Sequence, residues 1–264
     1  MRPSYAILSH TWGDVEATFQ DIKKIATAGP IQTSNPHLAD AFDKLYFCGQ
    51  QAANDGFQYF WVDTCCIDKD NHTELSTAII SMFRWDQSSA KCYALLTDVS
   101  VPEGDVDPAS VEAQLRQSRW FTRGWTLQEL LAPTAVEFFS KEGALIGSIK
   151  TLENLLSDIT GIPLSALRGT YVTYFGIQEK VSWVANRQTT CEEDIVYCLL
   201  GMCGIYMSPI YGEGKHHARH RLQDEIHGVC PAFQATDRPA PGVELVMVCE
   251  SVCGERLKTL RSLL

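Results

Sequence analysis

Glu129 is the residue of this sequence whose surroundings most suggest chemistry. It lies in the run RGWTLQELLAP, one helical turn after Trp125, with three leucines around it. Residues four apart share one face of a helix, so we expect the carboxylate to face a cleft walled by the tryptophan. A carboxylate in such a cleft can stabilise positive charge that develops in a transition state. The alternative interpretation is a solvated surface glutamate beside a core tryptophan.

A second group of polar residues follows two short apolar runs. Residues at the carboxyl ends of parallel strands face the ligands of such sheets, so we expect this group to line the same cleft as Glu129. Gly13 would let the backbone approach a ligand closely. Three alternatives stay open, in which Asp14 caps the next helix, Asp63 closes a turn and Trp12 belongs to the core. The expected cleft residues of this group are Ser9, His10, Trp12, Gly13, Asp14 and Asp63.

Strand and helix patterns alternate along the first half of the chain, and this order predicts an α/β fold with a mostly parallel central sheet flanked by helices. The expected strands are Tyr5–Leu8, which breaks at Ser9, then Tyr59–Val62, Cys92–Leu96 and Val136–Phe139. We expect three regions: an α/β domain over residues 1–149, a helical extension packed on it over residues 150–230, and a linker-like tail over residues 231–264.

Composition narrows the function classes. The 264 residues are 45% hydrophobic and 20% charged, which is typical of a folded protein. A net charge of −10 disfavours a nucleic-acid partner, because the surface repels the phosphate backbone. The uncharged run Ile195–Gly212 contains three glycines and Pro209, so it predicts a buried helix and a turn rather than a membrane span.

The ten cysteines predict a reduced, cytoplasmic chain, since no signal-peptide pattern follows Met1. We expect no metal and no bound cofactor. No C-x-x-C occurs, and His216 with His220 offers no clear third ligand. The dinucleotide fingerprint, the P-loop and the G-x-S-x-G elbow are also absent. A Cys–His protease built on Cys65 or Cys66 stays an alternative, although both cysteines follow a buried strand and suit a core.

Five blocks together resemble the fungal heterokaryon-incompatibility (HET) domain family, in that family's order. They are YAILSHTWGD, FWVDTCCIDKDNHTELSTAIISMFRWDQSSA, RWFTRGWTLQELLAP, VSWVANRQTTCEEDIVYCLLGM and YGEG with RLQDEI. The resemblance covers about Tyr5 to Ile226. It implies a cytoplasmic module that triggers regulated cell death when non-self is sensed, with an upstream sensor protein as its partner.

A more distant resemblance is to Toll/interleukin-1 receptor (TIR) domains, which have a flavodoxin-like α/β fold. It rests on AILSHTWGD, VDTCCIDKDNHTEL and WTLQEL, in which Thr126 replaces the cysteine of the TIR helix. In enzymatic TIR domains the glutamate of that helix cleaves NAD⁺, and by position it corresponds to Glu129. The resemblance implies an NAD⁺ glycohydrolase, with NAD⁺ or a related nucleotide as substrate and a homo-oligomer on activation. The alternative is a non-enzymatic, self-associating signalling module, because fold does not fix function.

Overall fold

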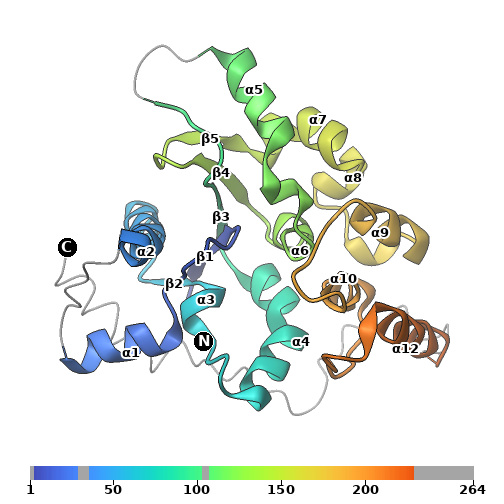
Figure 1. Cartoon of the computed structure of the whole chain (residues 1–264). Helices are drawn as coiled ribbons and strands as arrows, with labels where there is room; N and C mark the ends of the chain where they lie inside the picture. Colours follow the sequence, from blue (N-terminus) through green and yellow to red (C-terminus); the bar gives the residue numbers. More distant parts are fainter. Residues whose placement is uncertain (1–2, 29–35, 103–106, 229–264) are drawn as a thin grey trace.

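The structure is a computed structural model that describes residues 3–28, 36–102 and 107–228 (Figure 1). The predicted tail, residues 231–264, lies outside the described residues.

Five strands form one sheet in the order β2-β1-β3-β4-β5 (Figure 1). The first four strands are parallel, and β5 returns antiparallel to β4 as a hairpin. The predicted α/β fold with a mostly parallel sheet and flanking helices is therefore confirmed. The strands are β1 (Tyr5–His10), β2 (Tyr59–Trp61), β3 (Lys91–Leu96), β4 (Val136–Ser140) and β5 (Leu145–Ser148).

Two predicted strand ends were wrong. Strand β1 does not break at Ser9, because Ser9 and His10 still pair with Ala94 and Leu95 of β3. Strand β2 stops at Trp61, because Asp63 already begins a short helix. Both corrections shift polar residues from loops into regular structure, which fixes the direction of their side chains.

Helices separate and follow these strands. The helices are α1 (Phe19–Ala28), α2 (Pro36–Asn54), α3 (Asp63–Cys66), α4 (His72–Ser88), α5 (Pro108–Gln117), α6 (Thr126–Leu131), α7 (Ile149–Thr160), α8 (Leu164–Leu167), α9 (Ile177–Val184), α10 (Asp194–Tyr197), α11 (Leu200–Cys203) and α12 (Gly214–Gly228). Two 3₁₀ turns, η1 (Arg119–Thr122) and η2 (Val172–Tyr174), complete the described elements.

Local sequence explains several helix boundaries. Helix α4 begins after Asn71, whose side chain accepts the backbone N–H of Glu74. Helix α7 begins with a capping box of Ser148 and Thr151, and it ends at Gly161, whose φ of 68° suits glycine.

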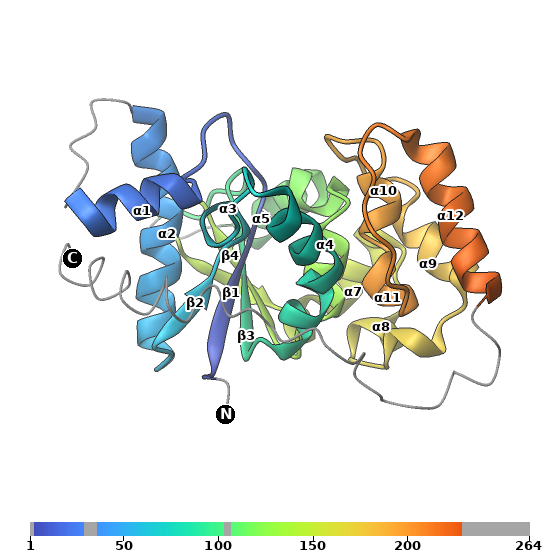
Figure 2. The ribbon, with the colours of Figure 1, turned by 90° about the horizontal axis from the view of Figure 1, so that it is seen from below.

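Alternation along the strands divides the core into two layers. Ala6, Leu8 and Tyr93 pack on the side of α1, α2 and α3. Ile7 and Ala94 point the other way, toward a larger core that includes residues of α6, α7 and α9. Both views place α1 and α2 on one side of the sheet and α8 to α12 on the other (Figures 1 and 2).

The helical extension shares its core with the α/β part. One cluster of buried residues joins strand residue Ile7 to Leu156, Trp183 and Met202 of the extension. Helix α11 also packs directly on α4, where a Cβ at Gly201 would lie 2.1 Å from the Cβ of Phe83. From this packing we expect the described chain to unfold as one cooperative unit. Within it, no helix has both the length and the apolar character needed to cross a membrane.

This packing predicts that Gly201→Ala destabilises the whole chain by about 1–3 kcal/mol, because the added methyl would overlap Cβ and Cγ of Phe83. Gly13→Ala is the matched control. Its nearest atoms would lie 3.7 Å away, so we expect a change within about 0.5 kcal/mol. Chemical denaturation followed by fluorescence and circular dichroism measures both. Two separate transitions, with only one affected by Gly201→Ala, would contradict a single cooperative unit.

Candidate functional site

The end of β1 sends two neighbouring side chains to opposite sides of the sheet. Ser9 continues the face of Ile7, toward α6, and His10 continues the face of Leu8, toward α1 and α3. Strand β1 also lies between β2 and β3, so the chain order reverses beside it. Ligands of open α/β sheets bind outside the carboxyl ends of strands at such a switch point.

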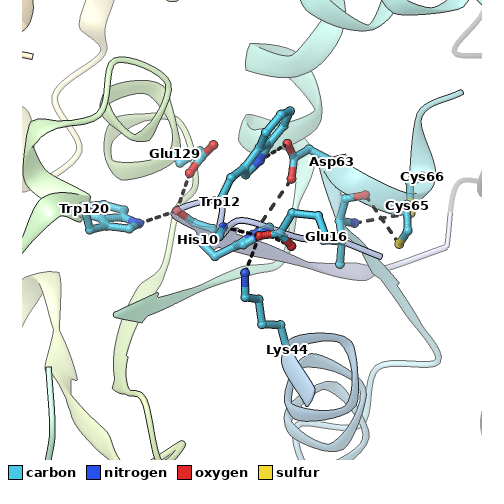
Figure 3. A network of polar contacts seen from close by, with 12 residues as sticks. His10, Trp12, Glu16, Lys44, Asp63, Cys65, Cys66, Trp120 and Glu129 are labelled. Atoms are coloured by element: carbon cyan, nitrogen blue, oxygen red, sulfur yellow. Dashed lines mark hydrogen bonds and ion pairs between the residues drawn. The ribbon is translucent and has the colours of Figure 1, made fainter. Parts of the chain in front are cut away.

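Ser9 joins Glu129 of α6 to Trp120 of η1 (Figure 3). The indole Nε1 of Trp120 donates to Ser9 Oγ over 2.8 Å, and an indole can only donate. The single hydroxyl hydrogen of Ser9 is therefore directed at Oε2 of Glu129. Both Ser9 and Trp120 are buried. This arrangement holds one carboxylate oxygen of Glu129 in place. Ser9 lies 120 positions before Glu129 and 111 positions before Trp120 in the sequence.

The surroundings of Glu129 favour its neutral form. Burial raises the pKa of its carboxyl from 4.5 to about 8, the hydrogen bond from Ser9 opposes this, and the negative charge of Asp63 adds to it. The cations Arg187 and Arg123 lower the pKa again. Few carboxyl groups in proteins change charge close to neutral pH, and those that do are concentrated at functional sites.

On the other side of β1, Glu16 holds the loop that follows the strand. Its Oε1 accepts the backbone N–H of Gly13 over 2.6 Å and pairs with Lys44 of α2. Its Oε2 lies 3.3 Å from Nε2 of His10. Burial raises the pKa of Glu16, but the hydrogen bonds and charge of His10 and Lys44 lower it to about 2. Glu16 is therefore an anion that ties the loop to both β1 and α2.

Trp12 rises from this loop on the same side as Glu129 and Asp63 (Figure 3). Its Nε1 donates to Oδ2 of Asp63 over 2.9 Å, and the Lys69 ammonium lies 3.6 Å from its ring centroid. The side chain is still 48% exposed, so the aromatic surface is available to a ligand. An exposed indole held by an anion and a cation is suited to stack on a planar ring.

The structure does not gather all of the predicted cleft residues. It brings Ser9 and Glu129 into contact and places Trp12 and Asp63 beside them (Figure 3). Trp125 instead packs between two core clusters and faces the carboxyl of Asp194 in α10. Its indole thus belongs to the contact with the extension.

His10, Gly13 and Asp14 occupy the other side of the loop. His10 is buried against Glu16, and its Nδ1 lies 4.0 Å from Asp63. Asp14 is exposed and does not cap α1, which starts at Phe19 after a Thr18–Asp21 bond. Gly13 has room for a methyl group among the atoms of the chain, so packing within the protein does not require glycine there.

Four residues near the site were missed by the sequence analysis: Trp120, Glu16, Lys44 and Arg187. Trp120 lies only five positions before Trp125, and no local pattern distinguishes the two. Glu16 had the clearest sequence signal, because a glutamate three residues after a glycine can accept the backbone N–H of that glycine. The structure has this bond from Gly13. The remaining pairings depend on elements distant in sequence.

A groove of about 970 Å³ runs along α2, but it is separate from the Glu129 group. Neither Glu129 nor Asp63 lines it. Its charges are mixed, with Lys44 and Lys141 facing three carboxylates, and Lys44 is already engaged by Glu16. We place the candidate site at Glu129, because a buried hydroxyl donor holds its carboxyl there, whereas Lys44 of the groove is paired with Glu16 and Lys141 lies 3.8 Å from Glu142. The lining acids of the groove are Asp14, Asp43 and Glu142.

Metal and thiol chemistry find little support among the described residues. Across residues 3–28, 36–102 and 107–228, no three His, Cys, Asp or Glu side chains could hold a metal ion together. Cys65 and Cys66 are buried, and Sγ of Cys65 contacts the carbonyl of Val62. His10 contacts Glu16 instead of either thiol, so the alternative of a Cys–His pair is not assembled at His10.

Comparison with known proteins decides the family. Residues 5–108 match the family model described as heterokaryon incompatibility protein (HET). Over 227 residues, 85% of its length, the chain is 48% identical to vegetative incompatibility protein HET-E-1 of Podospora anserina. The chain belongs to the HET family. The names of the family model and of the relative both refer to incompatibility.

The aligned part spans 16% of the length of the Podospora protein. No solved structure matches the chain, so the resemblance to TIR domains stays a prediction. The segment matched by the HET model also ends before Glu129, so that match carries no information on the carboxylate.

The YGEG block of this HET chain has a structural role in the extension. Oε1 of Glu193 accepts the backbone N–H groups of Gly212 and Gly214 over 2.8 and 2.9 Å. The hydroxyl of Tyr197 donates to Glu213 over 2.7 Å. These bonds fix the turn that starts α12, and none of them involves Ser9 or Glu129.

The Glu129 environment predicts a pH-dependent effect of Glu129→Gln on stability. Because the pKa of Glu129 is raised in the folded chain, proton binding favours folding. This stabilisation is complete below pH 4.5 and is lost as the pH rises through about 8. Relative to the parent, the free energy of unfolding of Glu129→Gln should therefore rise between these values, by up to about 1.4 kcal/mol per pH unit.

Urea denaturation across this pH range measures the difference, with Glu112→Gln, an exposed residue of α5, as the matched control. A flat difference for both variants would show that the carboxyl is not held in its neutral form.

Proposed function

We propose that this HET chain cleaves NAD⁺ to nicotinamide and ADP-ribose, with Glu129 as the catalytic residue. The observation that carries the proposal is the contact of Ser9 with Glu129 at the switch point of the sheet. A charged or chargeable carboxyl held by a buried donor, beside an exposed indole, suits a ligand with a planar ring and a ribose. The predicted resemblance to TIR domains supports the same assignment.

The chemistry is a substitution at the ribose carbon C1′. The bond from C1′ to the nicotinamide nitrogen breaks, and nicotinamide leaves with the electron pair, which neutralises its positive charge. Water forms the new C1′–O bond and releases one proton. The transition state resembles the oxocarbenium ion of glycoside hydrolysis. The Glu129 carboxylate would stabilise this positive charge, while Trp12 would stack on a planar ring of the substrate.

The cellular role follows from the same proposal. Loss of NAD⁺ in the cytoplasm would cause regulated cell death, and this links the reaction to heterokaryon incompatibility. We further propose that the chain becomes active as a homo-oligomer under an upstream sensor protein. A non-enzymatic, self-associating module would produce the same phenotype without consuming NAD⁺, so nicotinamide release separates the two functions.

The first prediction from this proposal concerns Glu129→Gln. The substitution keeps the shape of the side chain and an acceptor for Ser9 but removes the negative charge. We expect nicotinamide release to fall by about 10²–10³-fold, the usual effect of losing one electrostatic contact to the transition state. Chromatography of NAD⁺ reactions, run with and without crowding agents that drive assembly, measures the rate.

Glu112→Gln is the matched control and should retain the parental rate. If the parent releases no nicotinamide under either condition, the signalling module replaces the enzyme. If the parent is active and Glu129→Gln is equally active, another carboxylate performs the reaction, and Asp63 is the nearest candidate.

The second prediction concerns pH. Only the ionised form of Glu129 stabilises the transition state, and its pKa is raised to about 8. The value of kcat/KM should therefore increase about tenfold per pH unit below this pKa and level off above it. A rate that is constant or falls from pH 6 to about 8 would contradict a carboxylate in this role.

A further inference from the structure

Arg187, which follows α9 in the extension, reaches into the α/β part of the chain. Its guanidinium is buried, with 7% of the residue exposed. Nη1 donates to the carbonyl of Arg123 over 2.8 Å and to Oγ1 of Thr126 over 2.9 Å. Its Nη2 is buried and has no hydrogen-bond partner in the part of the chain that the structure describes. A buried cation with a free N–H is costly unless a nearby negative charge compensates it.

The backbone beside Arg187 docks on the segment that leads into α6. Gln188 N–H donates to the carbonyl of Thr122 over 2.6 Å, and Gly124 N–H donates to the carbonyl of Gln188 over 2.9 Å. The two segments approach so closely that a Cβ at Gly124 would lie 2.5 Å from Cγ2 of Thr189. The extension therefore fixes where α6 begins, and α6 carries Glu129.

A chain of hydrogen bonds continues from Arg187 to the carboxylate. Thr126 Oγ1 accepts from Arg187 and lies 2.6 Å from the carbonyl of Trp120, to which it donates. Trp120 then donates to Ser9, and Ser9 donates to Glu129. Strand β1, turn η1 and helix α6 of the α/β part thus meet the segment after α9 in a single polar network.

The charges that face Glu129 come from several elements. Asp63 of α3 is negative, and buried Asp86 of α4 also interacts with the carboxyl. The positive groups are Arg123, just before α6, and Arg187. The thiol of Cys92 in β3 lies close enough for its own pKa to be raised, by burial first and then by Asp86 and Glu129. Because Arg187 is more deeply buried than Arg123, its charge is less screened by water.

We propose that Arg187 is a positioning residue, through which the helical extension orients Glu129 for the reaction and favours its ionised form. The inference rests on the proposed function for its catalytic consequence only. A lysine is a poor substitute, since one ammonium cannot present the planar fork that bonds two acceptors at once. The extension is then a required part of the active unit, and any movement of the segment after α9 changes the charge of the carboxyl.

The test follows the ionisation of Glu129 directly. Protein labelled with ¹³C at glutamate side-chain carboxyls is titrated by NMR, and the Glu129 signal is assigned by its loss in Glu129→Gln. In Arg187→Gln we expect the titration midpoint to rise by about one pH unit. At pH 7 the ionised fraction, and with it kcat, should then fall about tenfold, while KM changes little because Arg187 does not touch substrate.

Two further variants keep the result interpretable. Thr126→Val preserves shape but removes the hydroxyl between Arg187 and Trp120, so we expect a smaller upward shift of the midpoint and a lower kcat. Arg187→Lys keeps the charge but not the planar fork, so its midpoint should lie between those of the parent and of Arg187→Gln. Arg168→Gln, which removes an exposed arginine of the extension, is the matched control and should leave the Glu129 signal unchanged.

Each outcome decides one of the two proposals. If folded Arg187→Gln titrates as the parent does, Arg187 does not position Glu129. If Arg187→Gln does not fold, an unchanged midpoint and kcat in Thr126→Val overturn the inference in the same way. If the parent shows no NAD⁺ cleavage but the midpoint shifts as expected, the proposed function fails while the link from Arg187 to Glu129 stands.

Discussion

The hydroxyl of Ser9 is the contact on which the arrangement of this molecule depends. It accepts from a buried indole and donates to a carboxyl, so both of its partners need it in one position. Leaving a buried donor without a partner costs about 1–3 kcal/mol. The strand that carries Ser9 is central in the sheet, and both partners come from the segment between β3 and β4. The sheet order, the turn η1 and helix α6 are thereby fixed relative to one another.

Around that contact, the two sides of β1 differ in the charge that they favour on a carboxyl group. On one side, Glu16 is stabilised as an anion by His10, Lys44 and a backbone N–H. On the other side, Glu129 is disfavoured as an anion by burial and by Asp63. Both carboxyls lie near the carboxyl end of β1, yet they differ in their preferred charge. The ion pairs of this region thus hold the loop after β1, and the charge of Glu129 can change with pH or with a bound ligand.

Much of the fold could be predicted from the sequence, whereas the site could be predicted only in part. Apolar runs such as Tyr5–Leu8 identify strands because burial on both faces leaves no polar alternation. Glu129 and Ser9 were recognisable because each follows a clear element boundary or motif. Trp125 and Trp120 were not distinguishable, because local spacing does not reveal which indole faces a strand and which faces the extension. Arg187 carried no signal at all, since its partners lie about sixty positions earlier.

The core shared by the sheet and the extension reaches beyond the segment that the family model matches. The HET family model ends at residue 108, but the core that covers the strands continues through Trp183 to Met202. A recombinant fragment cut at the end of the matched segment would leave the apolar face of β1 and β3 in water, and it would lack β4 and α6 altogether. The segment matched by the family model is therefore shorter than the unit that packs around one core, and expression boundaries for this chain are better chosen from the packing than from that match.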